Sequence, residues 1–141
     1  LSLHDALPIF PENHPLTTAD AVHWTDLRHQ VFVLPTDGIG PIVAEMLASK
    51  LGAQGHRANI ITQDTSIESV ISTVTIGRYV TIVTEASTGV VWPSLNFLEI
   101  SDNGGAARLD VSLYWRADND NPALKRFLKM LQERYPSLQG E

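Results

Sequence analysis

The segment from Pro35 to Gly40 is the part of this sequence best suited to hold a small ligand. Thr36 and Asp37 offer short polar side chains, and Gly38 and Gly40 let a ligand approach the backbone. The segment stands between an apolar run and a helix pattern, and a helix N-terminus presents free N–H groups and a positive dipole end. The pattern therefore predicts a site for an anion such as a carboxylate. The alternative is that Thr36 or Asp37 only caps the helix that follows.

The glycines of this segment also allow a dinucleotide-binding interpretation. Gly38-Ile39-Gly40 matches part of the fingerprint, but its third glycine would fall at Val43. Asp64 stands roughly where an acid that binds ribose belongs, after the next expected strand. A fragment of an NAD-dependent α/β dehydrogenase is therefore one alternative function.

Other patterns with catalytic or metal-binding chemistry are missing or incomplete. The sequence has no Gly-x-Ser-x-Gly elbow, no His-Glu-x-x-His and no Walker loop. His14, His23 and His29 match no common metal-ligand spacing, and we expect them to be solvated loop side chains. Asp118 and Asp120 lack the bidentate glutamate of a calcium loop. We therefore predict no enzyme activity, no catalytic residue, no metal site and no cofactor.

The composition is that of an ordinary globular domain. The 141 residues are 43% apolar and 18% charged, and their net charge of −6 argues against direct binding of nucleic acid by this chain. The sequence has no cysteine and no apolar run near the roughly 20 residues of a membrane helix. We expect a cytoplasmic protein that does not interact with a membrane.

Hydrophobic periodicity predicts a β-α-β-α-β unit with parallel strands between Val31 and Val83. The expected elements are strands at Val31–Leu34, His56–Thr62 and Tyr79–Val83, and helices at Ile39–Leu51 and Thr65–Gly77. Thr65 and Glu68 fit a capping box. Ligands bind beyond the carboxyl ends of such strands, so the candidate loops are 35–40, 63–65 and 84–87.

The remainder of the chain predicts a mixed arrangement. We expect a short helix at Trp24–Arg28, strands at Leu95–Ile100 and Leu109–Trp115, a turn at Asp102–Gly105, and a final helix capped by Asn121. The buried stripe expected on that helix consists of Leu124, Phe127, Leu128 and Leu131. Trp24 and Trp115 are expected to serve in packing.

The first nine residues, Leu1 to Ile9, resemble the translation of a common sequencing-library adapter. On this interpretation the native sequence begins near Phe10, the chain is a fragment, and removing residues 1–9 changes the free energy of unfolding by less than ~0.5 kcal/mol. The alternative is a native strand at this position.

From His14 onward, the chain resembles the second half of the effector-binding domain of LysR-type transcriptional regulators. The similarity rests on the order and spacing of several weak motifs: His14-Pro15-Leu16, Trp24-Thr25-Asp26-Leu27, Phe32-Val33-Leu34-Pro35, the helix at Thr65–Gly77, Tyr114-Trp115-Arg116 and Pro122–Leu128. Two departures are Gly77-Arg78-Tyr79, where the family usually has Gly-x-Gly, and Thr84, where it commonly has proline.

The resemblance implies a truncated α/β fold like that of type 2 periplasmic binding proteins, a Rossmann-like subdomain with α-β-α layers. It implies a hinge at residues 10–15, followed by the C-terminal part of the effector-binding domain at residues 16–141. Within that part, the second subdomain spans about 16–100 and the chain returns to the first subdomain over about 105–135. It also implies an effector in the cleft between the subdomains. The effector contacts that it implies in this half are Thr36, Asp37, Gly38, Ile39, Gly40, Val83 and Thr84.

The function implied by the resemblance is sensing a small-molecule effector, expected to be anionic. In that case DNA is bound only through an N-terminal domain outside this chain, and the full-length protein is a homo-oligomer. A fragment of a periplasmic-type substrate-binding protein used in uptake is the second alternative, because that class shares the fold.

Overall fold

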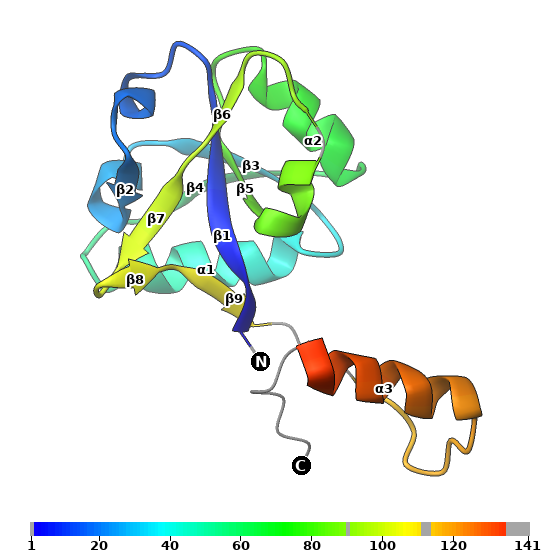
Figure 1. Cartoon of the computed structure of the whole chain (residues 1–141). Helices are drawn as coiled ribbons and strands as arrows, with labels where there is room; N and C mark the ends of the chain where they lie inside the picture. The colour runs from blue at the N-terminus through cyan, green and yellow to red at the C-terminus, as the bar shows by residue number, and fades with distance from the viewer. Residues whose placement is uncertain (1, 90, 111–113, 135–141) are drawn as a thin grey trace. The chain divides into compact units, whose positions relative to one another are not determined.

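The computed structural model describes residues 2–89, 91–110 and 114–134 of the chain. The chain divides into two units: His4–Leu109, and 110–141 together with Leu1–Leu3. Each is considered by itself below (Figure 1). Among the described residues, no helix is both long enough and apolar enough to cross a membrane.

The elements alternate between strands and helices for most of the larger unit (Figure 1). The strands are β1 (Ser2–Pro11), β2 (Ala21–His23), β3 (Val31–Pro35), β4 (Asn59–Gln63), β5 (Thr81–Thr84), β6 (Leu95–Phe97), β7 (Glu99–Asp102), β8 (Gly105–Ala106) and β9 (Arg108–Asp110). The helices are α1 (Gly40–Gly52), α2 (Ile67–Val74) and α3 (Pro122–Arg134), with short 3-10 helices η1 (Pro15–Thr18), η2 (Trp24–Leu27) and η3 (Glu85–Gly89).

The predicted parallel β-α-β-α-β unit is confirmed. β3 and β4 pair in parallel, from Val31 opposite Asn59 to Pro35 opposite Gln63. A parallel bridge joins Phe32 to Val80, just before β5. β4 begins later than the predicted strand at residue 56. Long crossover connections through helices are what parallel neighbours require.

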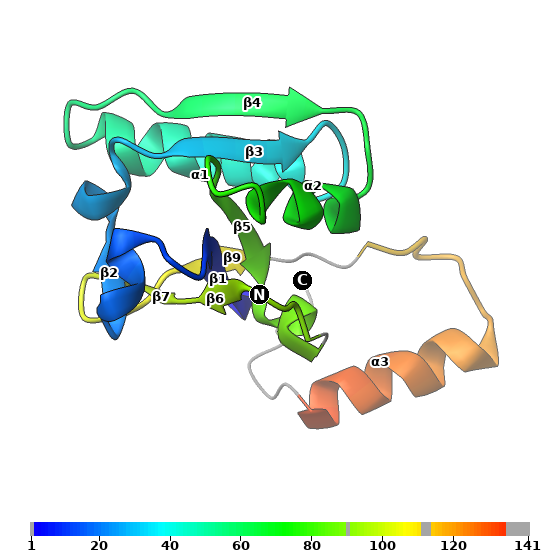
Figure 2. The same ribbon diagram turned by 90° about the horizontal axis from the view of Figure 1, so that it is seen from above.

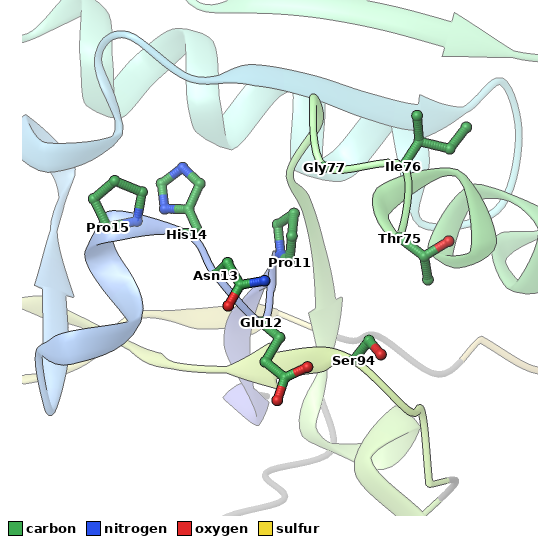
Figure 3. Close-up of a pocket in the computed structure, with 9 residues that line it drawn as sticks. All are labelled: Pro11, Glu12, Asn13, His14, Pro15, Thr75, Ile76, Gly77 and Ser94. Carbon is green, nitrogen blue, oxygen red and sulfur yellow. The ribbon is translucent and has the colours of Figure 1, made fainter.

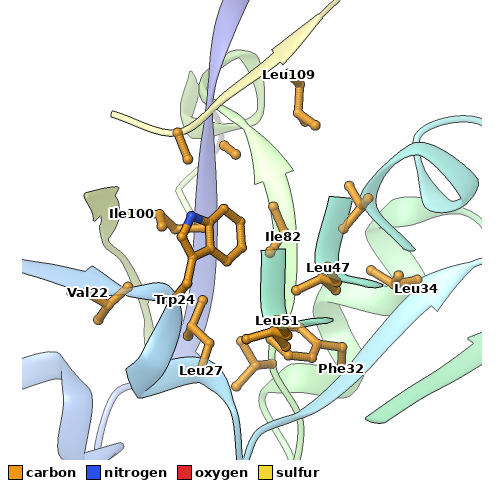
Figure 4. Close-up of a cluster of buried hydrophobic side chains, with 14 of the residues drawn as sticks. Val22, Trp24, Leu27, Phe32, Leu34, Leu47, Leu51, Ile82, Ile100 and Leu109 are labelled. Atoms are coloured by element: carbon orange, nitrogen blue, oxygen red, sulfur yellow. The ribbon is translucent and has the colours of Figure 1, made fainter. Parts of the chain in front are cut away.

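Two buried clusters, one associated with each helix, form the core of this unit. Val43, Leu47 and Leu51 of α1 pack in one cluster with Phe32 and Leu34 of β3 (Figure 4). In the other cluster, Val70, Ile71 and Val74 of α2 pack with Val33 of β3. Because successive strand residues point to opposite faces, this alternation places α1 and α2 on opposite sides of β3, as the three-layer prediction requires.

β1 lies inside the sheet, between β5 on one side and β6 on the other. Ile9 is opposite Thr81 of β5 and Phe97 of β6, and both pairings are antiparallel. Ala6, Ile9 and Phe10 are completely buried. Of the first nine residues, Ala6 lies in the α1 cluster and Ile9 in the α2 cluster. How much residues 1–9 contribute to the free energy of unfolding stays a prediction, and the burial of Ala6 and Ile9 argues for a contribution larger than ~0.5 kcal/mol.

The segment predicted as a single strand at 95–100 instead divides into β6 and β7, which belong to different sheets. β7 pairs in parallel with β2 and in antiparallel with β8. The predicted turn at residues 102–105 is confirmed: Asn103 and Gly104 have φ of 50° and 88°, the left-handed conformation of tight hairpin turns. The Lys50 ammonium of α1 contacts the Asp102 carboxylate at 2.5 Å.

The predicted helix at 65–77 exists, but its cap is different. The Oγ atom of Ser66 accepts the Ser69 N–H at 3.4 Å, whereas the Thr65 N–H donates to the Gln63 carbonyl. Ser66 therefore takes the N-cap position predicted for Thr65.

The smaller unit contains α3, whose start matches the prediction. The Asn121 side chain accepts the Ala123 N–H at 2.9 Å, and no described residue of α3 is buried. The expected stripe is therefore only partly covered: Leu124, Leu128 and Leu131 are half-buried and Phe127 is 42% exposed. Met130 on the same helix is 54% exposed, and Trp115 is 47% exposed instead of packed. Of the strand expected at 109–115, only its start lies in β9, and residues 111–113 lie outside the described residues.

Candidate functional site at the carboxyl edge of the parallel strands

The loops that follow β3 and β4 meet at one edge, here called the carboxyl edge (residues 36–40 and 63–65). The Thr36 N–H donates to the Gln63 carbonyl at 3.0 Å, and the Thr36 hydroxyl donates to Oδ1 of Asp64 at 3.4 Å. In Figure 2 the arrowheads of β3 and β4 point the same way. The structure thus joins two of the three loops predicted to carry the site.

The predicted glycines of this edge shape the turn into α1. Gly38 has φ of +56°, and the Gly40 N–H donates to the Asp37 carbonyl at 3.0 Å. A Cβ atom on Gly40 would lie 1.8 Å from the Pro35 carbonyl oxygen, so only glycine fits there. These two positions therefore have a folding role whether or not a ligand is present.

Neither polar side chain of the loop caps α1, which was the alternative to ligand binding. Ile39 occupies the N-cap position and makes no capping hydrogen bond through its side chain. Thr36, Asp37 and Gly38 are exposed, whereas Ile39 is half-buried and packs against the α1 cluster. The hydroxyl of Thr36 and the carboxylate of Asp37 are thus left at the surface beside the start of α1.

The side chains of the carboxyl edge carry negative charge only. Asp37 and Asp64 are its charged residues, and both are exposed. Because Thr36 donates its proton to Asp64, its remaining lone pairs can accept hydrogen bonds but the hydroxyl has no second proton to donate. The donors available to an anion at this edge are therefore backbone N–H groups around the start of α1. The Gly40 N–H is not among them, because it is bonded to the Asp37 carbonyl, and Pro41 has no N–H.

Of the two predicted site residues in β5, only one has a partly accessible side chain. Val83 is 1% exposed and packs in the α2 cluster, so its side chain belongs to the core. Thr84 is half-buried and lies opposite Ala6 of β1. The parallel bridge before β5 directs Thr84 toward the same edge as Thr36. The hydrogen bonds of Thr36 itself are made with Gln63 and Asp64, at the end of β4.

Glu68 in the first turn of α2 has a pKa below its ordinary value. A hydrogen bond to its own backbone amide lowers the pKa most, and a hydrogen bond with the Ser66 side chain lowers it further. Glu68 is exposed. The start of α2 therefore stabilises negative charge next to its free N–H groups.

The histidines do not assemble into a metal site. His14 is half-buried and its Nε2 lies 3.0 Å from Oε1 of Gln30, which corrects the expectation that it is solvated. His23 and His29 are exposed, as expected. Within the described part of the chain, no three or more side chains of the ligating types gather closely enough to hold a metal ion.

Sequence reasoning missed a pocket of about 390 Å³ (Figure 3). The pocket lies between residues 11–15 and the end of α2, near the residues that precede β5. We call it the α2-end pocket, and its lining residues are Pro11, Glu12, Asn13, His14, Pro15, Thr75, Ile76, Gly77 and Ser94. These residues come from three separate parts of the sequence, and no local motif marks them.

A family model, the LysR substrate binding domain, matches residues 4–136. The chain belongs to this family. The match includes both units and most of β1, and it agrees with the resemblance found from His14 onward.

Known proteins support the same assignment. The HTH-type transcriptional regulator ClcR of Pseudomonas putida is 30% identical over 117 residues, which cover 82% of this chain and 38% of ClcR. The LysR family regulator CbnR has a crystal structure with TM-score 0.72 at 16% identity, covering 94% of this chain and 46% of CbnR. This LysR-family chain therefore spans less than half the length of either relative.

Structures of separate regulatory domains show the same fold. The effector binding domain of a BenM variant has TM-score 0.72 at 14% identity, with 96% of this chain and 63% of that domain covered. The reduced OxyR regulatory domain from Pseudomonas aeruginosa has TM-score 0.69 at 16% identity, with coverages of 89% and 59%. The predicted fold class, that of a type 2 periplasmic binding protein, is thus confirmed.

Proposed function

We propose that this chain is the effector-binding portion of a LysR-type transcriptional regulator, acting without catalysis in the cytoplasm. The observation that carries this proposal is the family match over residues 4–136. In the complete protein, DNA would be bound through an N-terminal domain and the assembly would be a homo-oligomer. The net charge of −6 is consistent with a chain that does not itself bind DNA.

Within that framework, residues 10–15 form the hinge, residues 16–100 form most of the second subdomain, and residues 105–135 return to the first. The effector site is placed at Thr36–Gly40 together with Thr84. Support for this placement comes from the carboxyl edge, where the starts of α1 and α2 and the Thr36 hydroxyl lie on adjacent loops. Ligands of open parallel sheets bind at such edges.

The effector that suits this edge is a carboxylate with a hydrogen-bond donor beside it. The backbone N–H groups at the start of α1 would receive the carboxylate, helped by the positive end of the helix. Asp37, Asp64 and the accepting lone pairs of Thr36 would receive the donor. For a simple carboxylate, the repulsion of the two aspartates would oppose the attraction of these N–H groups. An adjacent donor would turn Asp37 and Asp64 into favourable partners, so this donor decides which anion binds.

The placement of the site can be tested on the chain itself with salicylate, benzoate and phenol. Salicylate has a hydroxyl beside its carboxylate, and the other two probes each lack one of these groups. We expect salicylate to shift the backbone amide NMR signals of residues 36–40 and 63–65 at lower concentration than either single-group probe. Signals that shift only elsewhere would contradict this site.

A test of the regulatory function requires the full-length protein. The full-length protein should bind its own upstream DNA in a mobility-shift assay, and an effector should change that binding. Removing residues 16–135 should abolish the response to effector while leaving DNA binding. A full-length protein that binds no DNA, or one exported from the cytoplasm for uptake, would contradict the proposal.

A further inference from the structure

The α2-end pocket is negatively charged, and none of its lining residues balances that charge. Glu12 is the one formally charged side chain among the described lining residues. The pocket is also lined by Thr75, Ile76 and Gly77, which directly follow α2. A helix C-terminus carries partial negative charge, and the last turn of α2 contains no basic residue. Arg78 comes next in the sequence but does not line the pocket.

His14 contributes a neutral ring to this pocket. Its Nδ1 accepts the Leu16 N–H at 3.2 Å, so the ring proton must reside on Nε2, which donates to Oε1 of Gln30 at 3.0 Å. Both ring nitrogens therefore have partners. The ring of Phe10 also contacts His14, with centroids 4.8 Å apart. Held in this way, the imidazole supplies a flat, uncharged surface instead of a positive charge.

The remaining lining residues make one side of the pocket apolar. In Figure 3 the His14 ring and Pro15 lie across from Thr75, Ile76 and Gly77, with Pro11 between them. Two proline rings and an imidazole can contact a small apolar body, and aromatic faces attract cations. A negative group beside an apolar wall is the arrangement that suits an organic cation.

We propose that the α2-end pocket binds a small organic ammonium compound. The ammonium group donates hydrogen bonds to the Glu12 carboxylate and to backbone carbonyls at the end of α2, and its apolar part lies against the prolines and the His14 ring. The volume of about 390 Å³ is in the range of small-molecule sites. This site is separate from the proposed effector site, because it adjoins the residues that precede β5, whereas the carboxyl edge follows β3 and β4.

The probe for this proposal is benzylammonium, with benzyl alcohol and benzoate as the neutral and anionic partners of similar shape. The isotope-labelled full chain is titrated with each and followed by amide NMR. Saturating shifts at Asn13, Thr75–Gly77 and Ser94 with benzylammonium, together with much weaker shifts for the other two probes, would support the site. Equal shifts with benzyl alcohol, or shifts confined to other residues, would overturn it.

Two matched variants test the role of the charge. Glu12→Gln removes the carboxylate but keeps the side-chain shape, and Glu45→Gln makes the same change on an exposed position of α1. We expect Glu12→Gln to weaken benzylammonium binding about two- to fivefold, the usual range for an exposed ion pair, and Glu45→Gln to leave it unchanged. Equal weakening by both variants would mean non-specific attraction to an acidic protein and would overturn the proposal.

Discussion

The Thr36 hydroxyl donates to Oδ1 of Asp64 across 3.4 Å, and this contact joins the loops that follow two parallel strands. The two residues are 28 positions apart in the sequence. They become neighbours because β3 and β4 are in register up to Pro35 opposite Gln63. The contact fixes the direction of the only hydroxyl proton of Thr36, and with it the kind of group that a ligand can present to Thr36.

The first prediction concerns this hydroxyl. In the complete regulator, Thr36→Ala should weaken the response to effector by about 1 kcal/mol or more, the usual value for one lost hydrogen bond. Thr18→Ala, at another exposed hydroxyl whose partner is only the Pro15 carbonyl, is the matched control. The measurement is effector-dependent DNA binding, and DNA binding without effector should stay the same for both variants. An unchanged response in Thr36→Ala would place the effector elsewhere.

The second prediction concerns the turn into α1. Gly40→Ala would bring a Cβ atom to 1.8 Å from the Pro35 carbonyl oxygen, so the backbone must shift. We expect a loss of roughly 2–4 kcal/mol in the free energy of unfolding, typical of severe steric conflicts. Gly52→Ala, where nothing lies within 4 Å, should be neutral or stabilising. Urea denaturation measures both, and equal midpoints would disprove the close approach.

The third prediction concerns β1. Ile9 is completely buried and packs in the α2 cluster. Ile9→Ala should therefore cost roughly 2–4 kcal/mol in the free energy of unfolding, and deletion of residues 1–9 should prevent cooperative folding. Leu7→Ala, at a half-buried position of the same strand, should cost less. The measurement is thermal denaturation of the full chain and of the chain without residues 1–9. If the deletion changes the free energy of unfolding by less than ~0.5 kcal/mol, residues 1–9 do not contribute to the core and this prediction is wrong.

The fourth prediction concerns α3. Its apolar side chains are only partly covered within its own unit, with Phe127 42% and Met130 54% exposed. Exposed apolar surface of this kind favours association, so we expect the chain to self-associate at micromolar concentration in sedimentation velocity. Phe127→Glu should shift the population toward monomer, whereas Lys129→Glu on the same helix should have little effect. A wild-type chain that sediments as a single monomer would contradict this expectation.

The fifth prediction concerns acid stability. The pKa of Glu68 is lowered in the folded chain by its backbone and Ser66 hydrogen bonds. The stabilisation is therefore fully present above the ordinary pKa of 4.5 and is lost as the pH falls through the lowered folded-state value. Glu68→Gln should lower the melting temperature near pH 7, where the ionised carboxylate contributes, and the difference from the wild-type chain should shrink as the pH falls below about 4.5. The measurement is the melting temperature of the wild-type chain and of Glu68→Gln at a series of pH values. Two parallel curves of melting temperature against pH would contradict this prediction.

Local patterns predicted the α/β part of the fold well. Val31–Leu34 is a short apolar run ended by a proline, and the apolar residues of α1 recur at helical spacing, so the parallel unit could be predicted from the sequence. The Asn103–Gly104 turn followed from the conformational freedom of those residue types. What local patterns cannot encode is pairing between distant segments, which is why the central position of β1 and the division of β6 from β7 were not foreseen.

The candidate site was only partly accessible from the sequence. The position of Thr36–Gly40 at a strand end was predictable, and so was the nearby loop that contains Asp64. The direction of the Thr36 hydroxyl was not, because it depends on strand register. Val83 was assigned to the site by family resemblance, yet it alternates with Ile82 in such a way that its side chain enters the α2 cluster.

The central position of β1 has a consequence for the order in which this chain folds during synthesis. Within the larger unit, β1 leaves the ribosome before its partners β5, β6 and β9, and the last of these ends at Asp110. The unit β3-α1-β4 can form early from local contacts, whereas the strand between β5 and β6 must wait unpaired until about 75 further residues have emerged, a delay typical of non-local pairing. The apolar β1 segment is thus a natural binding site for chaperones on the nascent chain, and its exposure time grows as translation slows.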